Sequence, residues 1–198
     1  MPVRLDYKLI EEYIPHGARV LDVGCGDGSL LEQLKRRKDI EEQGIDVDMD
    51  AVRECVSRGI AVYHGDMLEG MSLFSDESFD CVVLSRTLQQ TLQPARVVEE
   101  MLRVGKRAVI SFPNFGYWRH RIQLLFSGRM PRTDLLSENW YDTPNIHLLT
   151  IKDFLNFCDQ WQLSIVDEIY LTTGYRRMPE AFANLLASMA IFVLENDE

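Results

Sequence analysis

The sequence has 198 residues, of which 46% are hydrophobic and 26% charged, and this composition excludes a largely disordered chain. Its 31 acidic and 21 basic residues give a formal net charge of -10, which argues against binding to the phosphates of nucleic acids. No apolar run approaches the roughly 18 residues that span a bilayer, and the first residues contain no apolar stretch of the signal-peptide type. We therefore expect one domain over residues 1–198, in the cytoplasm, with neither a membrane nor a nucleic-acid partner.

The four cysteines lie far apart in the sequence and form no CxxC pair. This spacing indicates neither a zinc site nor a disulfide framework, so we expect no metal and a reducing compartment. We interpret all four as small buried residues: Cys25, Cys55, Cys81 and Cys158.

Short β-branched runs alternate with stretches of helical spacing along most of the chain. Five runs have the composition of buried strands: 18–23, 43–47, 60–64, 79–85 and 106–112. Three stretches have helical spacing: 29–38, 48–59 and 94–104. Two further strands are expected at 163–171 and 190–195. The alternation predicts an α/β fold, a mostly parallel seven-stranded sheet with an antiparallel edge strand and helices on both faces.

Residues 113–150 interrupt this alternation, because they have no strand signal and are too many for a plain connection. We interpret them as a lid or insertion after the fifth strand. Within them, apolar residues at helical spacing predict a helix whose stripe packs mostly into the core, or marks a docking surface if apolar area is in excess. The stripe is Phe115, Trp118, Ile122, Leu125 and Phe126. Thr150 and Asp153 have the spacing of a capping box for the next helix.

A glycine-rich loop, VGCGDGS, follows the first expected strand. Gly24, Gly26 and Gly28 stand where a strand turns into a helix, and glycine there permits positive φ and a close backbone approach to a ligand. The helix N-terminus beyond them offers unpaired N–H groups. We expect Cys25 to line the same site, and Asp22 to orient the loop from beneath or to hold a ligand amino group through water.

Two carboxylates follow the next two strands. Asp46 lies 22 residues after Gly24, where it can accept both hydroxyls of a ribose, with Val47 beside it. Asp66 is placed to accept the amino group of an adenine, with Met67 against the ring, although an acid at this position is also a common helix cap. Because the carboxyl ends of parallel strands meet at one edge of the sheet, we expect these groups to share a crevice.

Ser85, Arg86 and Gln89 follow the fourth expected strand and are predicted to line the same crevice. An acidic crevice suits a cation better than a pyrophosphate, and the glycine spacing is one residue shorter than the GxGxxG pattern of dinucleotide enzymes. These observations favour S-adenosylmethionine, a sulfonium without phosphate, or its demethylated product S-adenosylhomocysteine. An NAD-linked enzyme is the weaker alternative.

Several stretches of the sequence resemble a known family. DVGCGDG, GIDVD and HGDM, in that order, are similar to the first three motifs of class I S-adenosylmethionine-dependent methyltransferases, over about residues 5–112. The leader RLDYKLIEEYIPHGARVLDVGCGDGSLL and the segments ISFPNFGYWRHRIQLLFSGRMP and NWYDTPNIHLLTIKDF resemble more specifically the MetW family, methionine biosynthesis protein W. With these segments the resemblance covers nearly the whole chain.

The resemblance implies a Rossmann-like class I methyltransferase fold and a role in methionine biosynthesis beside homoserine O-acyltransferase. It brings no established methyl acceptor. Two functions therefore stay open. The one we rank first is an S-adenosylmethionine-binding accessory or regulatory partner of that acyltransferase. The other is an active methyltransferase acting on a small acceptor such as a carboxylate.

No residue type or spacing identifies a general base or an acceptor. His147 is a weak catalytic candidate because imidazole titrates near neutral pH, and we favour a structural role for it over a catalytic one. Tyr7 is another, since its ring could close over the sulfonium or could simply pack. The sequence leaves the oligomeric state open, a homodimer included.

Overall fold

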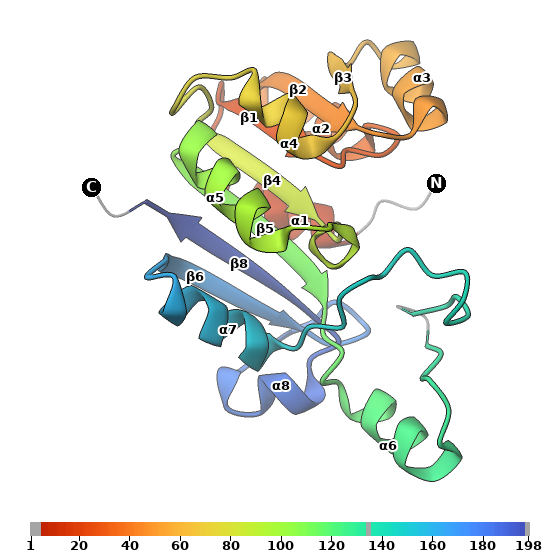
Figure 1. Ribbon diagram of the computed structural model, residues 1–198. Coiled ribbons are helices and arrows are strands. Elements are labelled where there is room, and N and C mark those ends of the chain that lie inside the picture. The colour runs from red at the N-terminus through yellow and green to blue at the C-terminus, as the bar shows by residue number, and fades with distance from the viewer. Residues whose placement is uncertain (1–4, 134–135, 197–198) are drawn as a thin grey trace.

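The computed structural model describes residues 5–133 and 136–196. Residues 134–135 of the expected lid, and both ends of the expected 1–198 domain, lie outside the described residues. The elements, shown in Figure 1, are α1 (Leu5–Glu11), β1 (Arg19–Val23), α2 (Ser29–Lys38), β2 (Glu41–Asp46), α3 (Met49–Ser57), β3 (Val62–His64), α4 (Met67–Ser72), β4 (Cys81–Ser85), the 3-10 helix η1 (Leu88–Gln90), α5 (Pro94–Val104), β5 (Arg107–Pro113), α6 (Trp118–Ser127), α7 (Ile151–Gln160), β6 (Ser164–Leu171), β7 (Arg177–Met178), the 3-10 helix η2 (Glu180–Phe182), α8 (Ala183–Leu186) and β8 (Met189–Glu195).

The strands form one mixed sheet in the order β3-β2-β1-β4-β5-β8-β6-β7. The first five strands of this order pair in parallel, and β8 runs antiparallel to both of its neighbours. The chain leaves β1 toward β2 on one side and later returns to β4 on the other side of β1. This reversal of strand order opens a crevice at the carboxyl ends of β1 and β4, where ligands bind in open α/β sheets.

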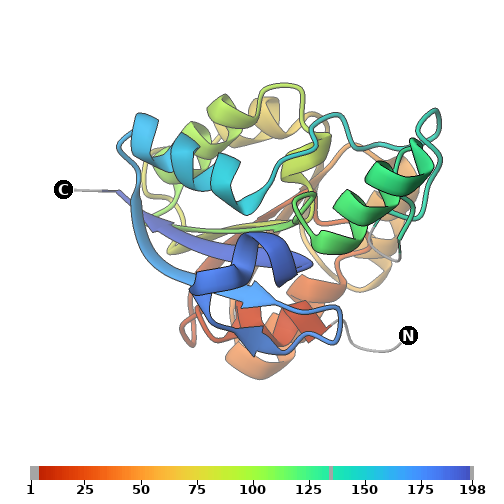
Figure 2. The ribbon, with the colours of Figure 1, turned by 90° about the horizontal axis from the view of Figure 1, so that it is seen from below.

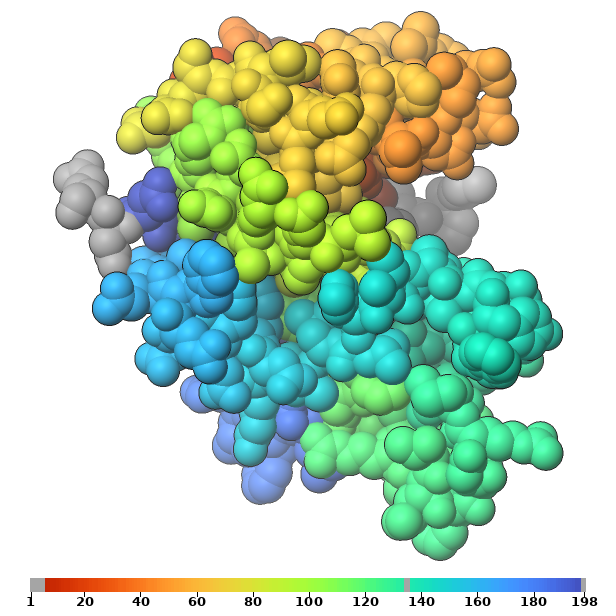
Figure 3. Space-filling view, viewed as in Figure 1, coloured from red at the N-terminus to blue at the C-terminus, as the bar shows by residue number. Residues whose placement is uncertain are grey.

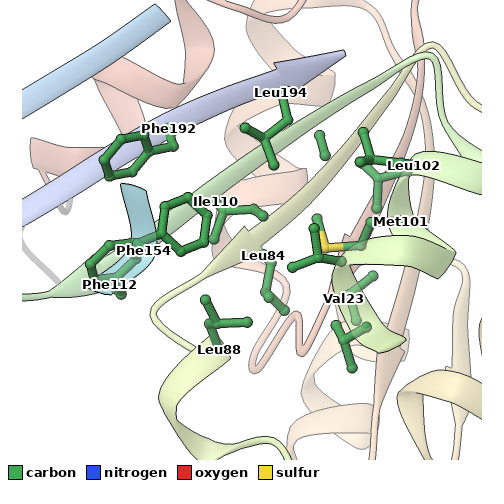
Figure 4. Packing of buried hydrophobic residues seen from close by; sticks show 14 of the residues in the cluster. Val23, Leu84, Leu88, Met101, Leu102, Ile110, Phe112, Phe154, Phe192 and Leu194 are labelled. Carbon is green, nitrogen blue, oxygen red and sulfur yellow. The ribbon is translucent and has the colours of Figure 1, made fainter. Parts of the chain in front are cut away.

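Successive residues of the central strands face opposite sides of the sheet. Val82 and Leu84 of β4 pack in a core cluster with α4, α5 and α7, whereas Cys81 and Val83 pack in a second cluster with α1, α2 and α3. Figure 4 shows the first cluster, which Phe192 of β8 also joins. Figure 2 shows the two helical layers on either side of the sheet. Burial of each Leu or Val side chain stabilises the fold by about 1.5–3 kcal/mol. The two helical layers therefore fix the central strands, and with them the edge of the sheet that carries the glycine loop.

Local signals predicted several element boundaries correctly. Pro94 begins α5, and Thr150 and Asp153 form both hydrogen bonds of the expected capping box at the start of α7. Gly105 ends α5 as expected, but its φ is -126°, so it adopts no left-handed conformation. Glycine is needed there for another reason, because an added Cβ would lie 2.4 Å from Val82 Cγ2.

Within the described residues the sheet has eight strands rather than the seven expected. All seven expected strands are present, and the additional one is the two-residue β7, which pairs antiparallel with β6. Its sequence, RM, is too short to show any alternation. The helix α4 was also not expected, because its six residues contain barely more than one turn of pattern.

The expected position of the apolar stripe on α6 is wrong. Leu125 and Phe126 are 76% and 81% exposed, and Trp118 and Ile122 are also exposed, so the stripe packs mostly outside the core. In Figure 1 the helix lies beyond the carboxyl end of β5, away from the sheet. Periodicity predicted the helix correctly, but it carries no information on whether anything covers the apolar face.

Every helix of the described residues is too short or too polar to span a bilayer.

Candidate functional site

The glycine loop leaves the carboxyl end of β1 and enters α2 at Ser29. Gly24 and Gly26 have φ of 71° and 55°, the left-handed region in which an added Cβ is strained. A Cβ on Gly24 would lie 2.7 Å from Thr87 Cγ2, so the loop and the segment after β4 approach more closely than a side chain permits. A Cβ on Gly26 would meet nothing within 4 Å, because that position faces open space.

The Asp46 carboxylate, at the end of β2, fixes the loop. Its Oδ2 accepts a 2.7 Å hydrogen bond from the Gly26 N–H, and its Oδ1 accepts one of 2.9 Å from the Asp48 N–H. Each carboxylate oxygen can accept two hydrogen bonds, so both retain a lone pair for the hydroxyls of a ribose. Asp48 itself caps α3, as its own side chain accepts from the Asp50 N–H.

Asp66, after β3, has two roles in the structure. Its Oδ1 caps α4 by accepting hydrogen bonds from the N–H groups of Leu68 and Glu69, at 2.8 and 3.4 Å. The carboxylate also lines the same cavity as Asp46, next to Met67. The two alternatives considered for this residue, cap and ligand contact, are therefore compatible.

A cavity of about 580 Å³ lies over these residues at the carboxyl edge of the sheet. Two carboxylates and several apolar side chains line it, and none of the described lining residues is Lys or Arg. This lining suits the hydroxyl and amino donors of an adenosyl group and a sulfonium, and it offers no cation to a pyrophosphate. The lining residues are Gly24, Gly26, Ile45, Asp46, Val47, Gly65, Asp66, Met67, Leu68, Thr87, Gln90, Thr91, Leu92, Gln93 and Val97.

Six of the predicted site residues thus come together around one cavity: Gly24, Gly26, Asp46, Val47, Asp66 and Met67. Three others are not among its lining residues. Asp22 is buried within β1, and Cys25 packs against Gly44 of β2, where an added Cβ would lie 2.7 Å from its Sγ. Gly28 packs in the same way against Cys55. Burial raises the pKa of the Cys25 thiol, so this thiol stays protonated and gives no nucleophile.

Ser85 and Gln89 also lie outside the lining. Arg86 has a φ of 60°, and η1 follows directly, so the turn buries the Gln89 side chain instead of presenting it to the cavity. Thr87 and Gln90 line the cavity in their place. Their location after β4 was a signal available in the sequence. Which residues of this turn face the cavity depends on the left-handed conformation of Arg86, which no sequence pattern indicated.

The structure does not bring the two catalytic candidates to the cavity. Tyr7 is buried in the apolar cluster between α1 and the sheet. His147 lines a separate, mostly apolar groove of about 290 Å³ between α5 and α7, and its backbone N–H donates to the Gln89 carbonyl at 3.0 Å. Among the described residues, none that lines the glycine-loop cavity carries an imidazole, phenol, thiol or amine.

Comparison with known protein families shows to which family this chain belongs. The profile of the family described as "Methionine biosynthesis protein MetW" matches residues 4–194. The chain belongs to the MetW family. One MetW-containing relative is the "Bifunctional methionine biosynthesis protein MetXA/MetW" of Rhodopirellula baltica, 33% identical over 206 residues. The alignment covers 98% of this chain and 33% of that protein, so the chain spans about a third of the bifunctional relative.

This MetW chain is also similar to methyltransferases. The "Ubiquinone biosynthesis O-methyltransferase" of Hahella chejuensis is 35% identical over 112 residues, which cover 53% of this chain and 45% of that enzyme. A crystal structure of an S-adenosylmethionine-dependent methyltransferase from Mesorhizobium loti matches with a TM-score of 0.70, at 15% identity, over 98% of this chain and 99% of that one. The fold is therefore the Rossmann-like methyltransferase fold.

One conspicuous arginine of the MetW chain is occupied by structural contacts. Arg86 Nε lies 3.1 Å from the Oδ2 of Asp6, a fully buried carboxylate on α1, and its guanidinium donates to the hydroxyl of Tyr175. These contacts join α1 and the β6–β7 hairpin to the end of β4. The guanidinium therefore already has an anionic and a hydroxyl partner. We do not assign it the role of binding the carboxylate of an acceptor.

Within residues 5–133 and 136–196, no group of three or more His, Cys, Asp or Glu side chains is placed to hold an ion.

Proposed function

We propose that this MetW chain binds S-adenosylmethionine or S-adenosylhomocysteine in the glycine-loop cavity and acts as an accessory or regulatory partner of homoserine O-acyltransferase. The main support for this ligand is the arrangement of Gly26 and Asp46. The glycine faces open space, and the carboxylate that fixes it retains lone pairs toward the same space. A ribose placed there brings the adenine toward Asp66 and Met67.

The partnership has separate support. A relative in which MetXA and MetW form one polypeptide aligns with 98% of this chain, and we take its MetXA part as the acyltransferase. Joining two proteins in one chain keeps them at high effective concentration, which is useful when they work together. Because S-adenosylmethionine is made from methionine, a ligand-dependent affinity for the acyltransferase would report the output of the pathway.

We also propose that the chain works in the cytoplasm. All four cysteines are free and buried, and the thiols of Cys25 and Cys55 share a 3.8 Å hydrogen bond with no disulfide between them. This arrangement fits a reducing compartment.

An active methyltransferase is the second candidate, favoured by the likeness to the ubiquinone O-methyltransferase over half of the chain. Methyl transfer is an in-line displacement that depends mainly on positioning, so the lack of an imidazole, phenol, thiol or amine in the described lining does not exclude it. A small acceptor that needs no deprotonation, such as a carboxylate, would require none of these groups as a general base.

Titration calorimetry with S-adenosylmethionine, S-adenosylhomocysteine and NAD tests the ligand. We expect the two adenosyl compounds to bind and NAD not to bind. Asp46→Asn preserves the volume and one acceptor oxygen, and we expect it to weaken adenosyl binding at least about tenfold, because a hydrogen bond to a charged group is lost. Asp50→Asn, on the exposed side of α3, is the matched control. Wild-type affinity in Asp46→Asn would refute this placement of the ribose.

The two functions are separated by assaying homoserine O-acyltransferase with and without this chain in the presence of S-adenosylmethionine labelled on its methyl group. A changed rate of acyl transfer without a labelled product supports the accessory role. A labelled small molecule formed at a catalytic rate supports the methyltransferase instead.

A further inference from the structure

The helix α6 has an unusual relation to the rest of the molecule. All ten of its residues are described, and His120 alone among them is buried. Its large apolar residues are exposed, above all Leu125 at 76% and Phe126 at 81%. A surface helix normally turns its apolar stripe toward the core, so α6 is inverted with respect to that pattern.

Polar contacts hold α6 in this inverted position. His120 bonds through Nδ1 to the Phe115 carbonyl at 3.2 Å and through Nε2 to Thr133 Oγ1 at 2.9 Å. Arg121 Nε donates to the Gly116 carbonyl at 2.6 Å, near the start of the helix. The helix is thus attached by its polar side, and its apolar residues remain available to another molecule.

A hollow of about 620 Å³ lies beside α6. Phe115, just before the helix, and residues of the segment that follows it line this hollow. The lining combines apolar side chains with two arginines and one glutamate: Phe115, Arg129, Met130, Arg132, Glu138, Trp140 and Leu148. In Figure 3 the helix projects from the body below the loop of residues 136–148. We name α6 and this hollow together the α6 surface. A projecting apolar ridge next to a hollow has the form of a protein–protein contact with anchor side chains on both partners.

The charge of the α6 surface differs from that of the whole chain. Residues 113–133 contain four of the 21 basic residues and none of the 31 acidic ones, and Glu138 adds one carboxylate to the described lining of the hollow, so basic groups are in excess. A basic surface on a chain of net charge -10 selects a partner with an acidic contact face. Pairing of two α6 surfaces about a two-fold axis would bring their arginines together. An anionic bilayer would repel the acidic remainder of the chain.

We infer that the α6 surface is the docking site for homoserine O-acyltransferase, which would contribute an apolar groove with an acidic rim. The inference rests on the partnership proposed above and assigns it to a place on the molecule. The MetXA/MetW relative, which aligns with 98% of this chain, supports this enzyme as the occupant because both units are present there in one polypeptide. The α6 surface is separate from the lining of the glycine-loop cavity, so both can be occupied together.

The test measures the affinity of the purified chain for the purified homoserine O-acyltransferase of the same organism, by biolayer interferometry. The double variant Leu125→Glu/Phe126→Glu removes the apolar ridge, and we expect it to bind about 100-fold more weakly. Leu73→Glu is the matched control, since Leu73 is 66% exposed and ends α4, a helix that lies far from α6 in Figure 1. We expect it to bind like the wild type.

A second variant, Arg129→Glu, tests the charge. We expect it to weaken the complex about tenfold and to reduce the dependence of the affinity on salt. Calorimetry with S-adenosylmethionine on every variant checks the fold, because the glycine-loop cavity contains none of the substituted residues.

Each result has a definite meaning. If the wild type does not bind the acyltransferase, the proposed partnership fails and this inference fails with it. If the wild type binds and Leu125→Glu/Phe126→Glu binds equally well, only the inference is overturned. The inference is also overturned if the double variant keeps its affinity for the acyltransferase but loses another interaction. That interaction would be self-association, measured by sedimentation velocity, or co-sedimentation with phosphatidylglycerol vesicles.

Discussion

Two glycines of the same loop should respond differently to the same substitution. Gly24 and Gly26 both have positive φ, and both are followed by the helix α2. An added Cβ meets Thr87 Cγ2 at 2.7 Å and Thr87 Oγ1 at 2.9 Å in the first case, and only open space in the second. Gly24→Ala therefore disturbs the fold, whereas Gly26→Ala mainly places a methyl group in the proposed ligand cavity.

The magnitudes follow from these contacts. Positive φ costs an L-residue about 1–2 kcal/mol, and this applies to both variants. Gly24→Ala adds overpacking against Thr87, which costs about 1–3 kcal/mol more. We expect the free energy of unfolding to fall by about 2–5 kcal/mol for Gly24→Ala and by about 1–2 kcal/mol for Gly26→Ala. In a chain of this size each kcal/mol lowers Tm by about 2–4 °C.

Thermal unfolding and calorimetry with S-adenosylmethionine measure the two effects separately. We expect Gly24→Ala to have the lower Tm of the two variants. We expect Gly26→Ala to lose more affinity for S-adenosylmethionine for each degree by which its Tm falls. Adding Thr87→Ala to Gly24→Ala removes both of the closest atoms and should restore part of the lost stability. Equal Tm values for the two single variants, or no recovery with Thr87→Ala, would refute the reasoning from the Cβ contacts.

Three further outcomes are expected. Gly105→Ala should lower the free energy of unfolding in urea by about 1–3 kcal/mol, because its Cβ would lie 2.4 Å from Val82 Cγ2; a neutral effect would contradict the close approach of α5 to β4. Asp66→Ser should keep the cap of α4 and weaken S-adenosylmethionine binding, whereas Asp66→Ala should also lose about 1 kcal/mol of stability; identical calorimetric affinity in Asp66→Ser would remove this residue from the site. Burial lowers the pKa of the His120 imidazole from 6.5, so the unfolded chain takes up the proton more readily. Stability should therefore decrease as the pH falls below about 6.5, and less so in His120→Gln, as urea unfolding at pH 7.5 and 5.5 would show; equal losses in both proteins would argue against a buried neutral imidazole.

Local patterns were sufficient for most of the fold. Pro94 and the Thr150–Asp153 pair act through backbone geometry within a few residues, so their effect is visible in the sequence itself. The central strands were predicted because residues such as Val83 and Leu84 are buried on both faces of a parallel sheet, which requires a continuous apolar run.

Features that depend on distant contacts were not predictable. Gly44 is required because the Cys25 side chain of the glycine loop packs over it, a contact made only after β1 and β2 pair. The cavity lining after β4 is decided by the left-handed Arg86, which its buried partner Asp6 helps to hold. The stripe of α6 was predicted correctly as helical, but it was placed mostly in the core, with a docking surface as the alternative. Periodicity identifies the apolar face and does not show whether the core of the same chain covers it.

The position of β8 has a consequence for how the protein is made. β8 is synthesised after β6 and β7, yet it lies between β5 and β6 and supplies every backbone pairing that joins them within the described sheet. Until residues 189–195 have left the ribosome, the β6–β7 hairpin has no strand to pair with, and β5 presents an open edge. The half of the sheet that carries the glycine-loop cavity can therefore form during translation, while the other half waits for the last strand to be inserted.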